Sequence, residues 1–136
     1  MVMCKTILDA LERIAPKRLV EEWDNSGLLI GSPAHRTERV LVALDVTDAV
    51  VTRAMEKKAD MIVAHHPVIF KPLKHIRTDL SIGARIQTLL KHGIAVAAAH
   101  TNLDIAPGGL NDMLAKQLGL TDIKGFIKTG EEALYK

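Results

Sequence analysis

Short apolar runs alternate with helical patterns of apolar residues along most of this chain. Four runs are apolar almost throughout, and they fall at residues 28–31, 40–44, 61–64 and 94–99. Runs of this length, rich in Val, Ile, Leu and Ala, are typical of strands buried on both faces of a sheet. Each run is therefore expected to form a strand.

The segments around these runs carry apolar residues at helical spacing. The stripes fall at residues 6–15, 50–55, 82–90 and 110–118. Thr6 and Asp9 have the spacing of a capping box at the start of the first helix, and Pro16 is expected to end it. In the last helix the residues expected on the buried face are Leu110, Met113, Leu114 and Leu118.

Apolar strands separated by amphipathic helices indicate parallel βαβ units. The predicted fold class is therefore α/β, with a parallel or mostly parallel sheet covered by helices. A chain of 136 residues has room for one domain of ordinary size, and no internal repeat or low-complexity stretch divides it. We expect residues 1–136 to form a single α/β domain.

Composition and charge narrow the class of protein. Hydrophobic residues make up 48% and charged residues 25%, which is typical of a globular protein. The formal charge is only +2 and aromatic residues are 3%, so a nucleic-acid partner is not expected. The single cysteine, Cys4, cannot form an internal disulfide, and no apolar run is long enough to cross a membrane. We expect a cytoplasmic protein with no membrane partner.

Acidic and histidine residues follow three of the predicted strands. Asp45 follows the run at 40–44, and His65 and His66 follow the run at 61–64. His100 follows the run at 94–99, with Asp104 four residues later. Because the carboxyl ends of parallel strands meet at one edge of a sheet, where ligands bind, these side chains are expected to lie together. They are candidate metal ligands or acid–base groups.

Structural roles remain open for two of these residues. Asp45 stands just before a predicted helix, so capping that helix is the expectation for it. His100 is expected to order its loop or to support a ligand rather than to bind metal directly.

The adjacent histidines point to a metal site with more than one ion. On a straight strand they would face opposite sides, but beyond the strand's end His65 and His66 fit two ions about 3.5 to 4 Å apart. Asp104 could then supply an oxygen ligand to one ion. Histidine and carboxylate ligands suit Zn, Fe, Mn, Co or Ni without choosing among them.

Other chemistry is weaker in this sequence. The residues of one basic loop that could contact a phosphorylated substrate are Lys71, Lys74, His75 and Arg77. A solvated loop is the simpler interpretation of these charges. The phosphate-binding loops of nucleotide-binding proteins and the nucleophile elbow of hydrolases are absent from the sequence.

Four motifs resemble those of a known family. They are Trp-Asp-Asn-Ser-Gly-Leu at 23–28, Ala-Leu-Asp-Val-Thr at 43–47, Ala-His-His-Pro at 64–67 and His-Thr-Asn-Leu-Asp at 100–104. In order and spacing they resemble the dinuclear metal-centre proteins called GTP cyclohydrolase 1 type 2 homologues, or the Nif-three-like family. The resemblance implies an α/β fold, a ring-shaped homohexamer and two divalent metals per subunit. His65, His66 and Asp104 match three metal ligands of that family.

The same resemblance implies a longer architecture, of which this chain would be the N-terminal portion. The family completes its site with a His and a Glu near the C-terminus of a longer chain, and some members begin an inserted domain at the position of residues 131–136. We therefore expect fewer than two bound ions per chain. The leading hypothesis is a metal-dependent hydrolase that uses metal-activated water on a nucleotide or phosphoester. The alternative is a non-catalytic, ring-forming regulatory or interaction protein with a structural metal.

Overall fold

A computed structural model describes residues 1–125, 128–129 and 134–135, so the inserted-domain position at 131–136 lies mostly outside the described residues. The strands are β1 (Val2–Met3), β2 (Gly27–Ile30), β3 (Arg36–Thr37), β4 (Val40–Ala43), β5 (Met61–Ala64), β6 (Ala95–Ala98), β7 (Lys128–Thr129) and β8 (Leu134–Tyr135). The helices are α1 (Cys4–Ile14), α2 (Asp48–Glu56), α3 (Ser81–Lys91), α4 (Thr101–Ile105) and α5 (Leu110–Gln117), with a 3-10 turn at Lys17–Leu19.

The central sheet has four strands in the order β2-β6-β5-β4. Strands β4, β5 and β6 are parallel, and β2 runs antiparallel to β6 at the edge. The apolar runs thus form the expected strands, and the prediction of a mostly parallel sheet is confirmed. All four residues of β6 are buried, because this strand has neighbours on both sides and helices over both faces.

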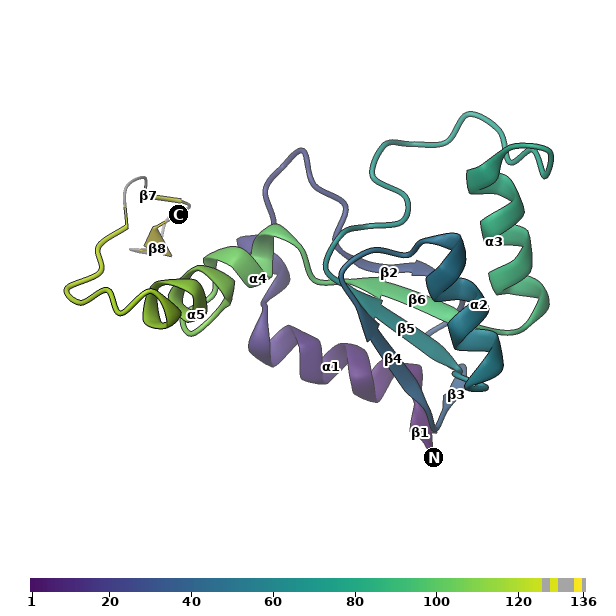
Figure 1. The fold of residues 1–136 in the computed structure, drawn as a ribbon, viewed down its shortest axis with the longest axis horizontal. Coiled ribbons are helices and arrows are strands. Elements are labelled where there is room, and N and C mark those ends of the chain that lie inside the picture. The colour runs from purple at the N-terminus through teal and green to yellow at the C-terminus, as the bar shows by residue number, and fades with distance from the viewer. Residues whose placement is uncertain (126–127, 130–133, 136) are drawn as a thin grey trace.

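Helices cover both faces of the sheet (Figure 1), so the fold class is α/β as predicted. On one face, Ile62 and Val96 join a core with residues of α2 and α3. On the other face, Met61 and Ala97 pack with Cys4 and the apolar stripe of α1. Alternate residues of the central strands β5 and β6 therefore face different helices, which explains why these two runs are apolar throughout.

The helix starts differ from two expectations. Helix α1 begins at Cys4, two residues before Thr6, and no side chain caps it, so the predicted capping box is wrong. Asp9 instead pairs with Lys5 at 2.7 Å, one turn earlier in the same helix. Helix α2 is capped by the Thr47 side chain, which accepts from the Val50 amide at 3.2 Å. The expected capping role of Asp45 therefore falls to Thr47.

The last two helices extend away from the sheet (Figure 1). Helix α4 was not predicted, because five residues are too few for a periodic pattern. Helix α5 starts after Gly109 as expected, but Met113, Leu114 and Leu118 are largely exposed. Their assignment to a buried face is wrong for the described residues. No helix within the described ranges is long and apolar enough to cross a membrane.

Candidate metal centre

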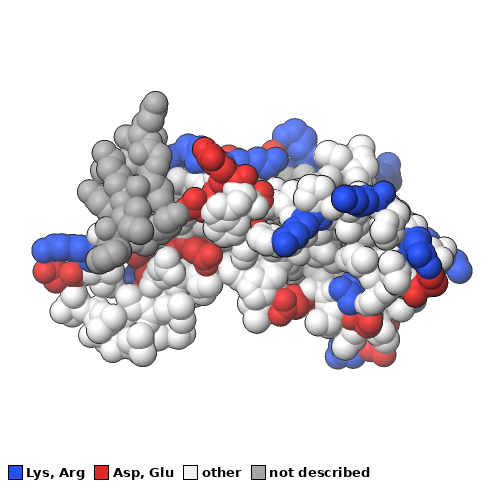
Figure 2. All heavy atoms as spheres, turned by 90° about the horizontal axis from the view of Figure 1, so that it is seen from above, with Lys and Arg blue, Asp and Glu red and all other residues white. Residues whose placement is uncertain are grey.

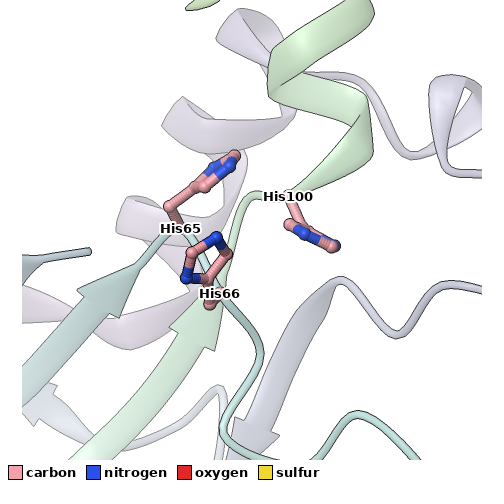
Figure 3. Close-up of side chains that lie close together, drawn as sticks. All are labelled: His65, His66 and His100. Atoms are coloured by element: carbon pink, nitrogen blue, oxygen red, sulfur yellow. The ribbon is translucent and has the colours of Figure 1, made fainter. Parts of the chain in front are cut away.

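Three histidines meet at the carboxyl edge of the parallel strands (Figure 3). His65 and His66 follow β5, and His100 follows the neighbouring strand β6. One ring nitrogen from each residue lies within 4.8 Å of a ring nitrogen of the other two, so the group could hold a metal ion. The strand order explains this meeting, because β5 and β6 are adjacent and parallel and therefore end side by side.

The two adjacent histidines lie beyond the last residue of β5. Their rings are tilted by 47° with centroids 4.9 Å apart, so they do not point to opposite faces. Backbone hydrogen bonds to the end of β4 fix this segment, with the His65 amide 3.2 Å from the Ala43 oxygen and the His66 amide 2.9 Å from the Leu44 oxygen. Both imidazoles therefore reach the same region.

Each of the three rings has its Nδ1 atom next to a fixed oxygen. The His65 Nδ1 atom lies 2.9 Å from the backbone oxygen of Ala99. The His66 and His100 Nδ1 atoms lie 2.7 Å from Asp45 Oδ1 and 2.8 Å from Asp24 Oδ1. An acceptor at Nδ1 fixes the tautomer with the proton on that atom and leaves the Nε2 lone pair free. This is the arrangement that orients histidines as metal ligands.

Asp24 is the most constrained acid of the site. Its side chain has no exposed area, and burial alone would raise its pKa. Hydrogen bonds from Thr101, His100, the Asn25 amide and Ser26 outweigh that effect and lower the pKa of Asp24 to about 2. Asp24 is thus ionised at neutral pH, and its carboxylate fixes the orientation of the His100 ring through the Nδ1 atom.

The loop that carries His100 is fixed by neighbouring polar side chains. The His100 amide donates to Asn102 Oδ1 at 2.9 Å, and the Asn102 side-chain amide donates to the Ala15 oxygen at 2.6 Å. The same His100 amide lies 3.3 Å from Ser26 Oγ. The position of His100 is thereby built from segments before β2, after α1 and after β6.

Asp104 approaches the group from α4. Its Oδ1 atom lies 3.6 Å from the Nε2 atom of His65, and its side chain is partly exposed. Two ligands of one tetrahedral ion with bonds near 2.1 Å lie about 3.4 Å apart. The separation between the Asp104 carboxylate and His65 thus suits a shared ion. The structure therefore brings all three predicted residues to one edge and adds His100 to them.

Other titratable side chains lie outside the histidine cluster. The His92 Nδ1 atom donates to the backbone oxygen of Thr88, 2.9 Å away in the last turn of α3. Arg77 pairs with Asp79 in the long loop. Cys4 is fully buried, and this burial raises the pKa of its thiol, so the thiol is neither accessible nor easily ionised.

Sequence reasoning missed Asp24, Ser26 and Asn102 as parts of this site. Their contacts to the His100 loop span 76, 74 and 2 positions of the chain. The signal available is the run of turn-forming residues from Asp24 to Gly27. Turn-forming residues that also carry a carboxylate and a hydroxyl can serve both purposes.

Comparisons with known proteins show which family this chain resembles. A family model described as Duf34/NIF3 (NGG1p interacting factor 3) matches residues 2–134. A GTP cyclohydrolase 1 type 2 homolog of Halalkalibacterium halodurans is 48% identical over 132 residues, which cover 97% of this chain and 36% of that protein. A protein of the same name from Bacillus subtilis is 46% identical over 130 residues, covering 96% and 35%. The chain thus spans about a third of the length of these relatives.

Solved structures give the same assignment. The Bacillus cereus protein related to NIF3 aligns with a TM-score of 0.89 at 44% identity, covering 95% of this chain and 35% of that one. Reduced HcgD from Methanocaldococcus jannaschii aligns with a TM-score of 0.85 at 33% identity, covering 91% and 50%. Since the family model spans nearly the whole sequence and the folds superpose, this chain belongs to the Duf34/NIF3 family.

Proposed function

We propose that the chain binds a divalent transition-metal ion through the Nε2 atoms of His65, His66 and His100. Asp104 supplies an oxygen ligand to the same centre. The observation that carries this proposal is the hydrogen bond at each Nδ1 atom, which leaves all three Nε2 lone pairs available at one edge of the sheet. The donor set suits Zn, Fe, Mn, Co or Ni.

We further propose that the site is that of a metal-dependent hydrolase acting on a nucleotide or phosphoester. A divalent ion supplies, when bound, a Lewis acid that lowers the pKa of water. The chain's own contribution is orientation. Asp24 and Asp45 hold His100 and His66 in one tautomer, and the Ala99 carbonyl does the same for His65. Relatives named GTP cyclohydrolase 1 type 2 homolog support the choice of a nucleotide.

Turnover tests this function directly. The chain, stripped with a chelator and reloaded with zinc or manganese, is incubated with GTP and with a generic phosphodiester. We expect hydrolysis that needs the added metal and is lost in His66→Ala, whereas the control His92→Ala, at the end of α3, keeps it. Metal-independent turnover, or equal turnover in His66→Ala, contradicts the proposal.

The number of ions belongs to the same proposal. Three imidazoles and one carboxylate can fill the shell of a single ion, but they leave few ligands for a second. We therefore expect clearly fewer than two ions per chain by elemental analysis of the purified protein. Two tightly bound ions per chain would contradict this expectation.

A cytoplasmic location is also part of the proposal, supported by the buried free thiol of Cys4.

The alternative is a non-catalytic protein that self-associates around a structural metal, and the edge strand β4 favours it. The backbone oxygens of Arg39 and Ala43 accept hydrogen bonds from the β5 side. Because successive residues of a strand point their backbone groups to opposite sides, the N–H and C=O groups of Val42 point to the free edge of the sheet. Val42 and Leu44 are also largely exposed. An unprotected, apolar edge is a surface on which a second strand can pair.

If the β4 strands of two copies pair antiparallel with Val42 at the centre, Arg39 of one copy lies opposite Asp45 of the other. These two side chains have opposite charges, which favours the pairing. Sedimentation velocity tests this self-association: we expect an oligomer in the wild type and a monomer in Val42→Lys. A monomeric wild type at all concentrations contradicts it.

A further inference from the structure

Two large aromatic side chains are exposed beside the candidate metal centre. Trp23 is 61% exposed and Phe70 is 43% exposed, although the whole sequence contains only one Trp and two Phe. Their ring centroids are 6.1 Å apart with planes at 71°. A pair held edge to face in this way is well packed with itself, yet it leaves much of its area in water.

Both rings also contact His100. The centroid distances from His100 are 6.5 Å to Trp23 and 6.2 Å to Phe70, and both pairs are nearly perpendicular. His100 in turn is 5.1 Å from the ring of His65 and 5.6 Å from that of His66. The aromatic pair thus contacts one of the three rings proposed to bind metal, and it forms a wall on one side of the site.

The wall is fixed in place by the backbone around it. The Asn25 side-chain amide donates to the Ile69 oxygen at 2.6 Å, which ties the segment of Trp23 to the segment of Phe70. Asp24, next to Trp23, is anchored by its buried hydrogen bonds to Thr101 and His100. The two exposed rings therefore sit on a rigid support, as a binding surface requires.

Basic side chains follow the wall along the chain. Lys71 and Lys74 are exposed in the loop after Phe70, and no described residue forms an ion pair with either of them. Seen from above, Lys and Arg side chains stand over the part of the molecule that carries this loop (Figure 2). An exposed aromatic surface next to exposed positive charges suits a planar heteroaromatic ring that carries phosphate.

We infer that Trp23 and Phe70 form a stacking subsite for the heteroaromatic ring of a nucleotide, with Lys71 and Lys74 facing its phosphate groups. This inference rests on the proposed function, because it names the part of the substrate that lies beside the metal centre. Trp23 and Phe70 thus determine which substrates bind, and the histidines hold the metal ion that acts on them. A ring stacked on Trp23 lies within reach of the histidine cluster, whereas a phosphate ester without a ring gains nothing from the wall.

Trp23 is the only tryptophan of the chain, so its fluorescence reports directly on the subsite. The chain is titrated with GMP, GTP and ribose 5-phosphate, once with zinc and once in chelator, and free tryptophan corrects for light absorbed by the nucleotides. We expect saturable quenching by GMP and GTP and none by ribose 5-phosphate. In Phe70→Leu, the dissociation constant for GMP should rise about five-fold or more. The matched control Leu73→Ala, in the same loop, should keep the wild-type constant.

The outcomes separate this inference from the metal proposal. Quenching by GMP in chelator, with the Phe70→Leu effect, supports the subsite even if no metal binds. Zinc binding without saturable quenching by any nucleotide overturns the subsite and leaves the metal centre in place. Equal quenching by ribose 5-phosphate, or an unchanged constant in Phe70→Leu with wild-type zinc content, also overturns it.

Discussion

Replacing the buried carboxylate Asp24 tests how the site is held together. In Asp24→Asn the side chain keeps its size but loses its charge, and one oxygen becomes an amino group. In the wild type, Oδ1 accepts from the Asn25 amide and His100, and Oδ2 accepts from Ser26 and Thr101. Whichever oxygen is replaced, a backbone N–H, from Asn25 at Oδ1 or from Thr101 at Oδ2, faces an amino group in the variant.

The pKa of Asp24 gives the size of the effect. The hydrogen bonds lower this pKa from 3.8 to about 2 despite burial. At about 1.4 kcal/mol per pKa unit, the folded protein favours the charged form of Asp24 by about 2 to 3 kcal/mol. Loss of hydrogen bonds to a buried charge costs a similar amount, about 1.5 to 3 kcal/mol for each strong bond. We expect Asp24→Asn to lower the free energy of unfolding by about 2 to 4 kcal/mol.

Urea unfolding in the presence of a chelator measures this change without a contribution from metal. Trp23 fluorescence and far-ultraviolet circular dichroism report the transition. The control is Asp45→Asn, because Asp45 also bonds a histidine but its side chain is about half exposed, so less than about 1 kcal/mol is expected. In the folded variant, zinc should bind about 10- to 100-fold more weakly. A change below about 0.5 kcal/mol for Asp24→Asn would refute the reasoning.

Three further predictions concern other parts of the fold. The Arg39 backbone amide is the main cause of the lowered pKa of Asp60, so the ionised carboxylate stabilises the fold fully above pH 4, and this stabilisation is lost as the pH falls below 3.8, the ordinary pKa of Asp. The difference in urea midpoint between wild type and Asp60→Asn should therefore shrink as the pH falls below 3.8. Gly83→Ala should lower the melting temperature although alanine favours helices, because a Cβ there overlaps the Arg77 carbonyl oxygen; an unchanged melting temperature argues against that contact. Cys4 should react with a thiol reagent only as fast as the chain unfolds, since it is fully buried and burial raises its pKa; fast reaction in native buffer would contradict its place in the core.

Most of the sheet could be predicted from the sequence because its strands are apolar on both faces. The parallel strands β4, β5 and β6 could be predicted from their apolar runs and from the helical patterns between them, without knowledge of long-range contacts. The antiparallel direction of β2 could not be predicted in the same way, since it depends on pairing of Leu28 with Ala97, far apart in the chain. The exposed face of α5 was misjudged because a periodic stripe shows which residues share a face, not what lies against it.

The site was predictable in part for a similar reason. His65, His66 and Asp104 stand out because they follow buried strands, and parallel strands end together. The contribution of His100 depends on Asp24, whose carboxylate lies 2.8 Å from its ring across 76 positions of sequence. Spacing along the chain carries no signal for such a contact.

Crystals grown with zinc test the central claim most directly. An anomalous difference map at the zinc absorption edge locates every bound ion without assumptions about the protein. We predict a peak at about 2.1 Å from the Nε2 atoms of His65, His66 and His100, with the Nδ1 atoms still hydrogen-bonded to their oxygens. Absence of a peak at the carboxyl edge of the sheet, or zinc bound only at surface residues elsewhere, would contradict it.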